Sequence, residues 1–117
     1  MIKRDGTYKQ RHYHLPTPED HAVQNFVVAP GELDSDVVYV ARSVIDKGFQ
    51  ITYHVHNEEV ELFSLVSGNA YYNDNGAETE VHPGDSMYCP GHTGHSIGNF
   101  YDEPVVVIEM GYKIPNK

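Results

Sequence analysis

Hydrophobic and polar residues alternate over short runs along most of the chain, which is the pattern of β-strands with one buried face. The clearest alternation is in FQITYHVH at 49–56. Other runs of strand character lie at 36–45, 60–68, 69–72, 77–81, 86–89, 95–100 and 104–112. Turn-forming Gly, Pro, Asn and Asp residues separate them. Strands this short and this evenly spaced predict an all-β sandwich or barrel.

The N-terminal third lacks so clear a pattern. TPEDHAVQNF at 17–26 has the signals of a helix start, with Thr17 as the cap and Pro18 in the first turn. We therefore expect at most one short N-terminal helix. Residues 1–35 are predicted to pack on the barrel or on a dimer partner, residues 36–112 to form the barrel, and residues 113–117 to be a C-terminal tail.

Size and charge narrow the function classes. A chain of 117 residues suits one domain, and a net charge of −9 argues against binding to nucleic acid or to an anionic membrane. We see no apolar stretch long enough to span a bilayer and no apolar signal region. With Cys89 as the single cysteine, we expect a cytoplasmic protein.

The distribution of charge says more than its total. Residues 48–112 contain ten Asp and Glu residues and no Lys or Arg, and the chain has eight histidines. Solubility alone is the ordinary explanation for such acidity. Because neutral imidazole is the commonest metal ligand, the same composition also suggests that a cation binds among these residues.

Strict alternation on the strand at 49–56 puts His54 and His56 on one face and Ile51, Tyr53 and Val55 on the other. The histidines could simply face solvent. If they point into a barrel instead, the apolar face needs another cover, which the N-terminal segment or a second subunit could supply. The hypothesis of an inward-facing site therefore predicts a homodimer.

Two histidines two residues apart on a strand are close enough to bind one ion, and a carboxylate could join them. Glu61 shares a face with apolar neighbours on the following strand, where a buried carboxylate needs a neutralising partner. Glu59 has the same parity and is the alternative. Glu58 has the opposite parity and is expected to face solvent.

The spacing around these residues forms two ordered motifs. Gly48, five residues, His54, one residue, His56, four residues, Glu61, six residues and Gly68 match G(X)5HXH(X)3–4E(X)6G. After fifteen residues, Gly84, Pro90, His95 and Asn99 match G(X)5PXG(X)2H(X)3N, with His92 in place of its second glycine. The chain thus resembles the cupin superfamily over residues 48–68 and 84–99.

This resemblance implies a cupin jelly-roll barrel. It also implies that His54, His56, Glu61 and His95 bind one divalent transition metal per chain. Mn, Fe, Zn, Ni and Co all suit such a ligand set, so the metal is not specified.

Four further residues are candidates for the site. His92 is either an exposed residue of the loop at the barrel mouth or a proton shuttle or extra ligand. Tyr53 and Tyr88 lie on predicted strands, where tyrosines usually pack, yet each could bring a phenol to the site. Arg42 is either a surface residue or a cation that enters the barrel and binds a substrate carboxylate.

We expect a metal-dependent enzyme with chemistry of the lyase, isomerase or decarboxylase type. Its substrate would be a small oxygenated metabolite such as a polyol, a phenol or a keto or hydroxy acid. Two alternatives stay open, an Fe(II)-dependent dioxygenase and a non-catalytic cupin that binds or senses a small molecule. No nucleotide-binding motif occurs in the sequence.

Overall fold

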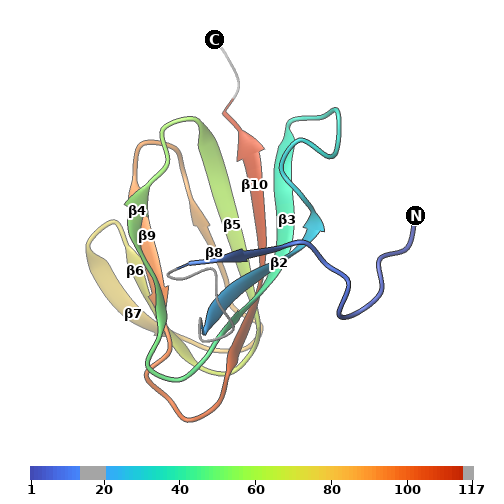
Figure 1. The fold of residues 1–117 in the computed structure, drawn as a ribbon. Coiled ribbons are helices and arrows are strands. Elements are labelled where there is room, and N and C mark those ends of the chain that lie inside the picture. Colours follow the sequence, from blue (N-terminus) through green and yellow to red (C-terminus); the bar gives the residue numbers. More distant parts are fainter. Residues whose placement is uncertain (14–20, 115–117) are drawn as a thin grey trace.

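The computed structural model describes residues 1–13 and 21–114 (Figure 1). They form ten strands: β1 (Gln10–His12), β2 (Ala22–Val28), β3 (Val37–Ile45), β4 (Gln50–Val55), β5 (Glu59–Ser67), β6 (Ala70–Asp74), β7 (Ala77–Val81), β8 (Ser86–Cys89), β9 (Gly94–Gly98) and β10 (Val105–Lys113). This part of the chain contains no helix, and so none that could cross a membrane.

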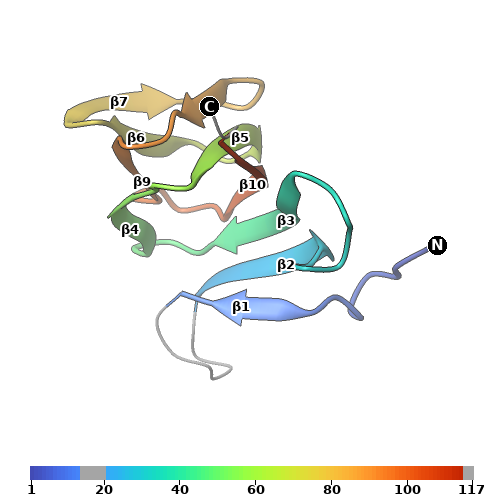
Figure 2. The ribbon, with the colours of Figure 1, turned by 90° about the horizontal axis from the view of Figure 1, so that it is seen from above.

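The strands form two antiparallel sheets. The larger has the order β1-β2-β3-β10-β5-β8 and the smaller the order β4-β9-β6-β7. From β3 to β6 the chain crosses between the sheets at every step, and β8, β9 and β10 repeat the crossing. Figure 2 shows β1 and β2 beyond β3, at the end of the molecule away from β7. The all-β jelly-roll prediction is confirmed.

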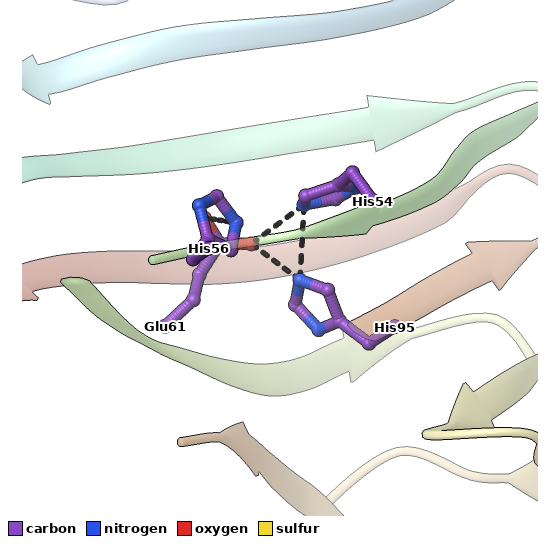
Figure 3. Close-up of side chains that lie close together, drawn as sticks. All are labelled: His54, His56, Glu61 and His95. Atoms are coloured by element: carbon purple, nitrogen blue, oxygen red, sulfur yellow. Dashed lines mark hydrogen bonds and ion pairs between the residues drawn. The ribbon is translucent and has the colours of Figure 1, made fainter. Parts of the chain in front are cut away.

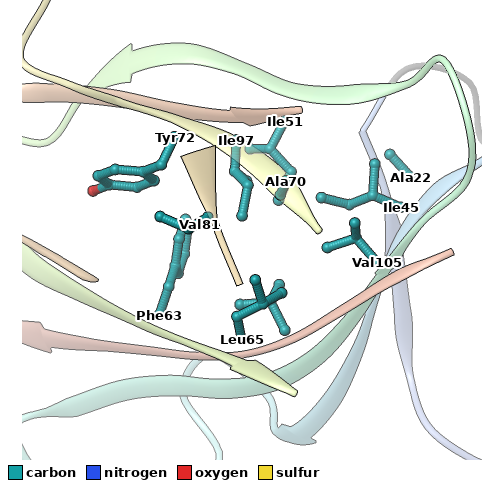
Figure 4. Close-up of a cluster of buried hydrophobic side chains, with 11 residues drawn as sticks. Ala22, Ile45, Ile51, Phe63, Leu65, Ala70, Tyr72, Val81, Ile97 and Val105 are labelled. Atoms are coloured by element: carbon teal, nitrogen blue, oxygen red, sulfur yellow. The ribbon is translucent and has the colours of Figure 1, made fainter. Parts of the chain in front are cut away.

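The hydrophobic core lies between the two sheets (Figure 4). The smaller sheet contributes Ile51 and Ile97, and the larger contributes Phe63, Leu65 and Val107, all at most 2% exposed. In β5 and β10 the inward positions alternate with outward ones, as a strand with one buried face requires. This core fixes the register of the strands that carry the site.

The predicted N-terminal helix is wrong for residues 22–26, and residues 17–20 lie outside the described part of the chain. Residues 22–26 belong to β2, where Ala22, Gln24 and Phe26 are buried. This period of two suits a strand, and pairing with β3 satisfies its backbone groups. β1 pairs with β2 in turn, so the N-terminal segment extends the larger sheet.

A β-bulge in β4 overturns the strict alternation expected at 49–56. Ile51 pairs with Ile97 and His54 with His95, so β4 advances three residues while β9 advances two. The extra residue lets both Ile51 and His54 face the interior. Ile51 is 2% exposed, whereas Tyr53 is 49% exposed. The uncovered apolar face used to predict a dimer is therefore smaller than the sequence suggested.

Gly68 makes a close backbone approach that only glycine permits. Its φ is +78°, and a Cβ built there would lie 2.4 Å from the carbonyl oxygen of Pro104. Gly48 has a similar φ of +82°, but a Cβ built there would have no atom of another part of the chain within 4 Å. A side chain at Gly48 would therefore strain only the backbone, whereas a side chain at Gly68 would also overlap with Pro104.

We expect Gly48→Ala to lower the free energy of unfolding by about 1 kcal/mol, through the left-handed backbone alone. Gly68→Ala should cost at least roughly twice as much, because the backbone at Pro104 must also move. Urea denaturation of both variants checks this. Equal losses would mean that the Gly68–Pro104 approach does not constrain the fold.

Candidate metal centre

Four side chains converge inside the barrel (Figure 3). They are His54 of β4, His56 just beyond it, Glu61 of β5 and His95 of β9. One potential ligand atom from each lies within 4.8 Å of all the others. The antiparallel pairing of His54 with His95 joins the two motifs, although 41 residues separate them. The structure therefore brings together the four residues expected to bind a metal.

The distances between these atoms suit ligands around one cation. His95 Nε2 lies 2.9 Å and His54 Nε2 3.6 Å from Glu61 Oε1, and His56 Nε2 lies 3.1 Å from Glu61 Oε2. His54 Nε2 and His95 Nε2 are 3.1 Å apart. Donor atoms about 2.1 Å from an ion are separated by about 3.0 Å at right angles and about 3.4 Å in a tetrahedron. The four contacts, at 2.9–3.6 Å, lie close to these separations.

Each histidine uses its other nitrogen to hold its ring in place. His54 Nδ1 lies 2.7 Å from the carbonyl oxygen of Thr52, and His95 Nδ1 lies 2.9 Å from the hydroxyl of Tyr72. His56 Nδ1 lies 3.2 Å from Glu59 Oε1. Because a carbonyl only accepts, the neutral ring of His54 carries its proton on Nδ1 and keeps a lone pair on Nε2. Such outer partners are typical of metal-binding histidines.

The three glutamates at positions 58, 59 and 61 differ in burial and in contacts. Glu61 is 4% exposed and lies within the cluster, whereas Glu59 contacts the outer nitrogen of His56. Glu58 is exposed. Burial alone would raise the pKa of Glu61, but hydrogen bonds from the cluster histidines and Tyr39 outweigh it and hold that pKa well below its usual range. Glu61 is therefore a buried anion.

Protons alone satisfy this cluster poorly. His54 Nε2 and His95 Nε2 face each other, and two nitrogens can share only one proton. His56 Nε2 is buried near Glu61 yet makes no aligned hydrogen bond with any described residue. A divalent cation would accept all three lone pairs and the carboxylate, so the residues fit a metal site of three nitrogens and one oxygen.

The charge states of the histidines follow the same contacts. Contacts with the carboxylates of Glu59 and then of Glu61 raise the pKa of His56 to about 10. The hydrogen bond to Glu61 also raises the pKa of His54, against the effect of burial. Without a cation, the raised pKa values of His54 and His56 therefore favour protons on these two rings, which offset the charge of Glu61.

A second buried carboxylate, Glu109 of β10, lies behind the cluster and is 1% exposed. Tyr13 Oη donates to its Oε1 over 3.1 Å, and Gln24 Nε2 donates to its Oε2 over 3.1 Å. Ser43 also donates to Oε1. Tyr39 donates to Glu61 and lies 3.2 Å from Glu109 Oε2. One tyrosine hydroxyl therefore connects the candidate ligand to the second carboxylate.

Burial, followed by the nearby charge of Glu61, raises the pKa of Glu109 to about 7. Burial also raises the pKa values of Tyr13 and Tyr39 far above the usual value, with further increases from the two carboxylates. Both phenols therefore remain protonated donors. Glu109 is the group of this network that gains and loses a proton near neutral pH.

A cavity of about 300 Å³ opens beside the cluster. Its walls include His54, His56 and Glu61 on one side, and Tyr13, Gln24, Tyr39 and Arg11 from the N-terminal strands and β3. The ligand atoms are therefore accessible to a small molecule.

The other candidate residues lie elsewhere. Arg42 is exposed on the outer face of β3, because Ala41 and Ser43 take the inward positions. Tyr88 is 64% exposed, and Tyr53 lies over Gly94 on the outside of the smaller sheet. His92 is exposed, with a φ of +69°, and its backbone N–H donates to the carbonyl oxygen of His56 over 2.6 Å. None of these four side chains lines the cavity.

Sequence reasoning missed the far wall of the cavity and the buried Glu109 behind it. The position of Glu109 could have been noticed, because this carboxylate stands in an apolar run, VVVIEMGY, as Glu61 does in its own. The period of two at residues 22–26 could have placed Gln24 on a strand. For Arg11 and Tyr13 we find no local signal.

Comparison with known proteins agrees with the fold. The model of the cupin domain family matches residues 41–111. No curated protein sequence matches the chain.

Solved structures resemble the chain closely despite low identity. A "predicted oxalate decarboxylase" from Thermotoga maritima has a TM-score of 0.76 at 18% identity, over 80% of this chain and 81% of that one. A protein from Photorhabdus luminescens has a TM-score of 0.74 at 20% identity, over 97% and 87%. A Cupin 2 conserved barrel domain protein from Salinispora arenicola has a TM-score of 0.68 at 21% identity, over 79% and 76%. Such likenesses show the fold alone. The family match covers more than half of the chain, which therefore belongs to the cupin domain family.

Proposed function

We propose that this protein is an enzyme that uses one divalent transition metal per chain to transform a small oxygenated metabolite. The convergence of three imidazole Nε2 atoms and the Glu61 carboxylate beside a cavity of about 300 Å³ carries this proposal. On a six-coordinate metal, four protein ligands leave coordination positions open for substrate. When bound, the metal would polarise a carbonyl or hydroxyl oxygen of the substrate and stabilise the negative charge that develops on it.

The buried network supports a catalytic function rather than binding alone. Tyr13 both lines the cavity and bonds to Glu109, so its hydroxyl connects a bound molecule with a buried acid. Burial raises the pKa of Glu109 above its usual value, which favours a protonated carboxyl that can supply a proton. In this proposal protonated Glu109 donates to the oxygen of the Tyr13 hydroxyl, which turns its own proton toward a substrate oxygen, and a proton from the substrate returns to Glu109 by the reverse path.

Lyase, isomerase and decarboxylase chemistry all combine a polarised oxygen with such a proton transfer. The likeness in fold to a "predicted oxalate decarboxylase" is compatible with this class of reaction. Activity of the metal-loaded protein on a panel of polyols, phenols and keto and hydroxy acids, with products identified by mass spectrometry, tests the proposal. Turnover only with Fe(II) and dioxygen would assign a dioxygenase instead. Tight binding without turnover would assign a binding or sensing protein.

Metal binding should depend strongly on the clustered ligands and less strongly on Glu59, which lies outside the cluster. We expect Glu59→Gln to lower metal affinity roughly 10–100-fold, because Glu59 only orients His56. Glu61→Gln and His95→Ala should lower it further, because each removes a ligand. Exposed His82→Ala is the matched control and should bind metal like the wild type. Equilibrium dialysis with elemental analysis measures all four, and wild-type affinity in Glu61→Gln would refute the assignment.

Glu109 should make folding stability depend on pH. Its pKa is raised from 4.5 to about 7 on folding. Its protonated form therefore favours the folded state below pH 4.5, and this contribution is lost as the pH rises through about 7. Glu109→Gln keeps the shape without the charge, so we expect its stability relative to wild type to increase by about 2 kcal/mol from pH 5 to pH 8.

Urea denaturation with excess chelator measures this difference in the metal-free proteins. Glu78→Gln, at an exposed position of β7, is the control and should show no such trend. A constant difference between Glu109→Gln and wild type would mean that Glu109 keeps one charge state over this range.

A further inference from the structure

The wall of the cavity away from the metal ligands carries its own recognition groups. Arg11 is the one Lys or Arg among the described residues that line the cavity. Its guanidinium carbon lies 5.7 Å from the ring centroid of Tyr13, and the hydroxyl of Tyr13 is anchored on Glu109. The ring therefore supports Arg11 at the cavity wall, where a guanidinium can pair with a carboxylate in two parallel hydrogen bonds.

Gln24 supplies an unsatisfied acceptor at the same wall. The residue is 3% exposed, and its Nε2 donates to Glu109 over 3.1 Å, which fixes the orientation of the amide. Its Oε1 is buried and has no hydrogen-bond partner among the described residues. A buried acceptor without a partner costs about 1–3 kcal/mol, so a bound molecule that brings a donor gains by supplying it.

The two carboxylates that line the cavity already have contacts within the protein. Glu61 belongs to the metal cluster, and Glu59 contacts His56. A divalent cation and Arg11 would together carry three positive charges, against the two carboxylates of Glu59 and Glu61 in the lining, which leaves one net positive charge. The cavity therefore favours an anion. Its volume of about 300 Å³ corresponds to about ten water molecules, which limits the ligand to a small one.

We infer that the substrate is a small hydroxycarboxylate whose carboxylate pairs with Arg11 and whose hydroxyl donates to Gln24 Oε1. This inference rests on the proposed function, because the metal would bind another oxygen of the same molecule. It disfavours neutral polyols and phenols, because they offer no carboxylate to Arg11, which is exposed at the cavity wall. It also excludes simple keto acids, which bring no donor to Gln24.

Three matched probes test this on the zinc-loaded protein: glycerate, glycerol and propionate. Glycerate has both the carboxylate and hydroxyl donors, whereas glycerol lacks the carboxylate and propionate lacks the hydroxyls. By calorimetry we expect glycerate to bind at least tenfold more tightly than either of the others. Equal affinity for glycerate and propionate would overturn the role of Gln24 without any substitution in the protein.

Arg11→Gln isolates the guanidinium. We expect it to weaken glycerate binding at least tenfold, while glycerol binding and zinc content stay at wild-type values. Arg42→Gln removes an exposed Arg on the outer face of β3 and should change neither affinity. An unchanged ratio of glycerate to glycerol affinity in Arg11→Gln would overturn the inference.

Gln24→Leu should reduce the preference for glycerate over propionate, with zinc content verifying that the site is intact. If zinc binds and turnover occurs but the ratios stay as in wild type, the inference fails and the proposed function stands. If the wild-type protein binds no metal, the proposed function fails first. The two failures are therefore distinguishable.

Discussion

The charge of Glu61 is the constraint on which the site depends. A carboxylate that is 4% exposed between two sheets needs positive charge close by, and three histidines and Tyr39 surround it. Only the jelly-roll crossing brings these residues together, because β4 and β9 lie in one sheet and β5 in the other. The fold thus places an anion at a point where neighbouring strands can neutralise it.

Most of the barrel could be predicted from the sequence, since β3 to β10 follow period-two patterns broken by turn residues. The four clustered residues could be identified from the spacing of residues in the two motifs, because this spacing reflects how the strands that carry them pair. The bulge in β4 was not predictable, because an extra residue leaves the sequence pattern unchanged and shows only in the pairing of Ile51 and His54. Arg11 was missed for a related reason, since nothing local ties it to a site more than forty residues away.

The site has an inner and an outer layer that differ in chemistry. The inner layer offers lone pairs, and the outer layer consists of groups that fix their directions: Thr52, Glu59, Tyr72 and Tyr39. These outer contacts come from a backbone carbonyl, a carboxylate and two phenols, so each ring is held by a different kind of partner. Rings held in this way lose little freedom when an ion binds, which favours tight binding.

The two walls of the cavity come from different parts of the chain. The metal-facing side chains lie between His54 and His95, within the family motifs, whereas Arg11, Tyr13 and Gln24 belong to β1, the residue after it, and β2. Neither β1 nor β2 takes part in the pairing of β3 with β10 or of β10 with β5. A lineage that kept the barrel and replaced only its first 28 residues could therefore acquire a new substrate while inheriting its metal unchanged.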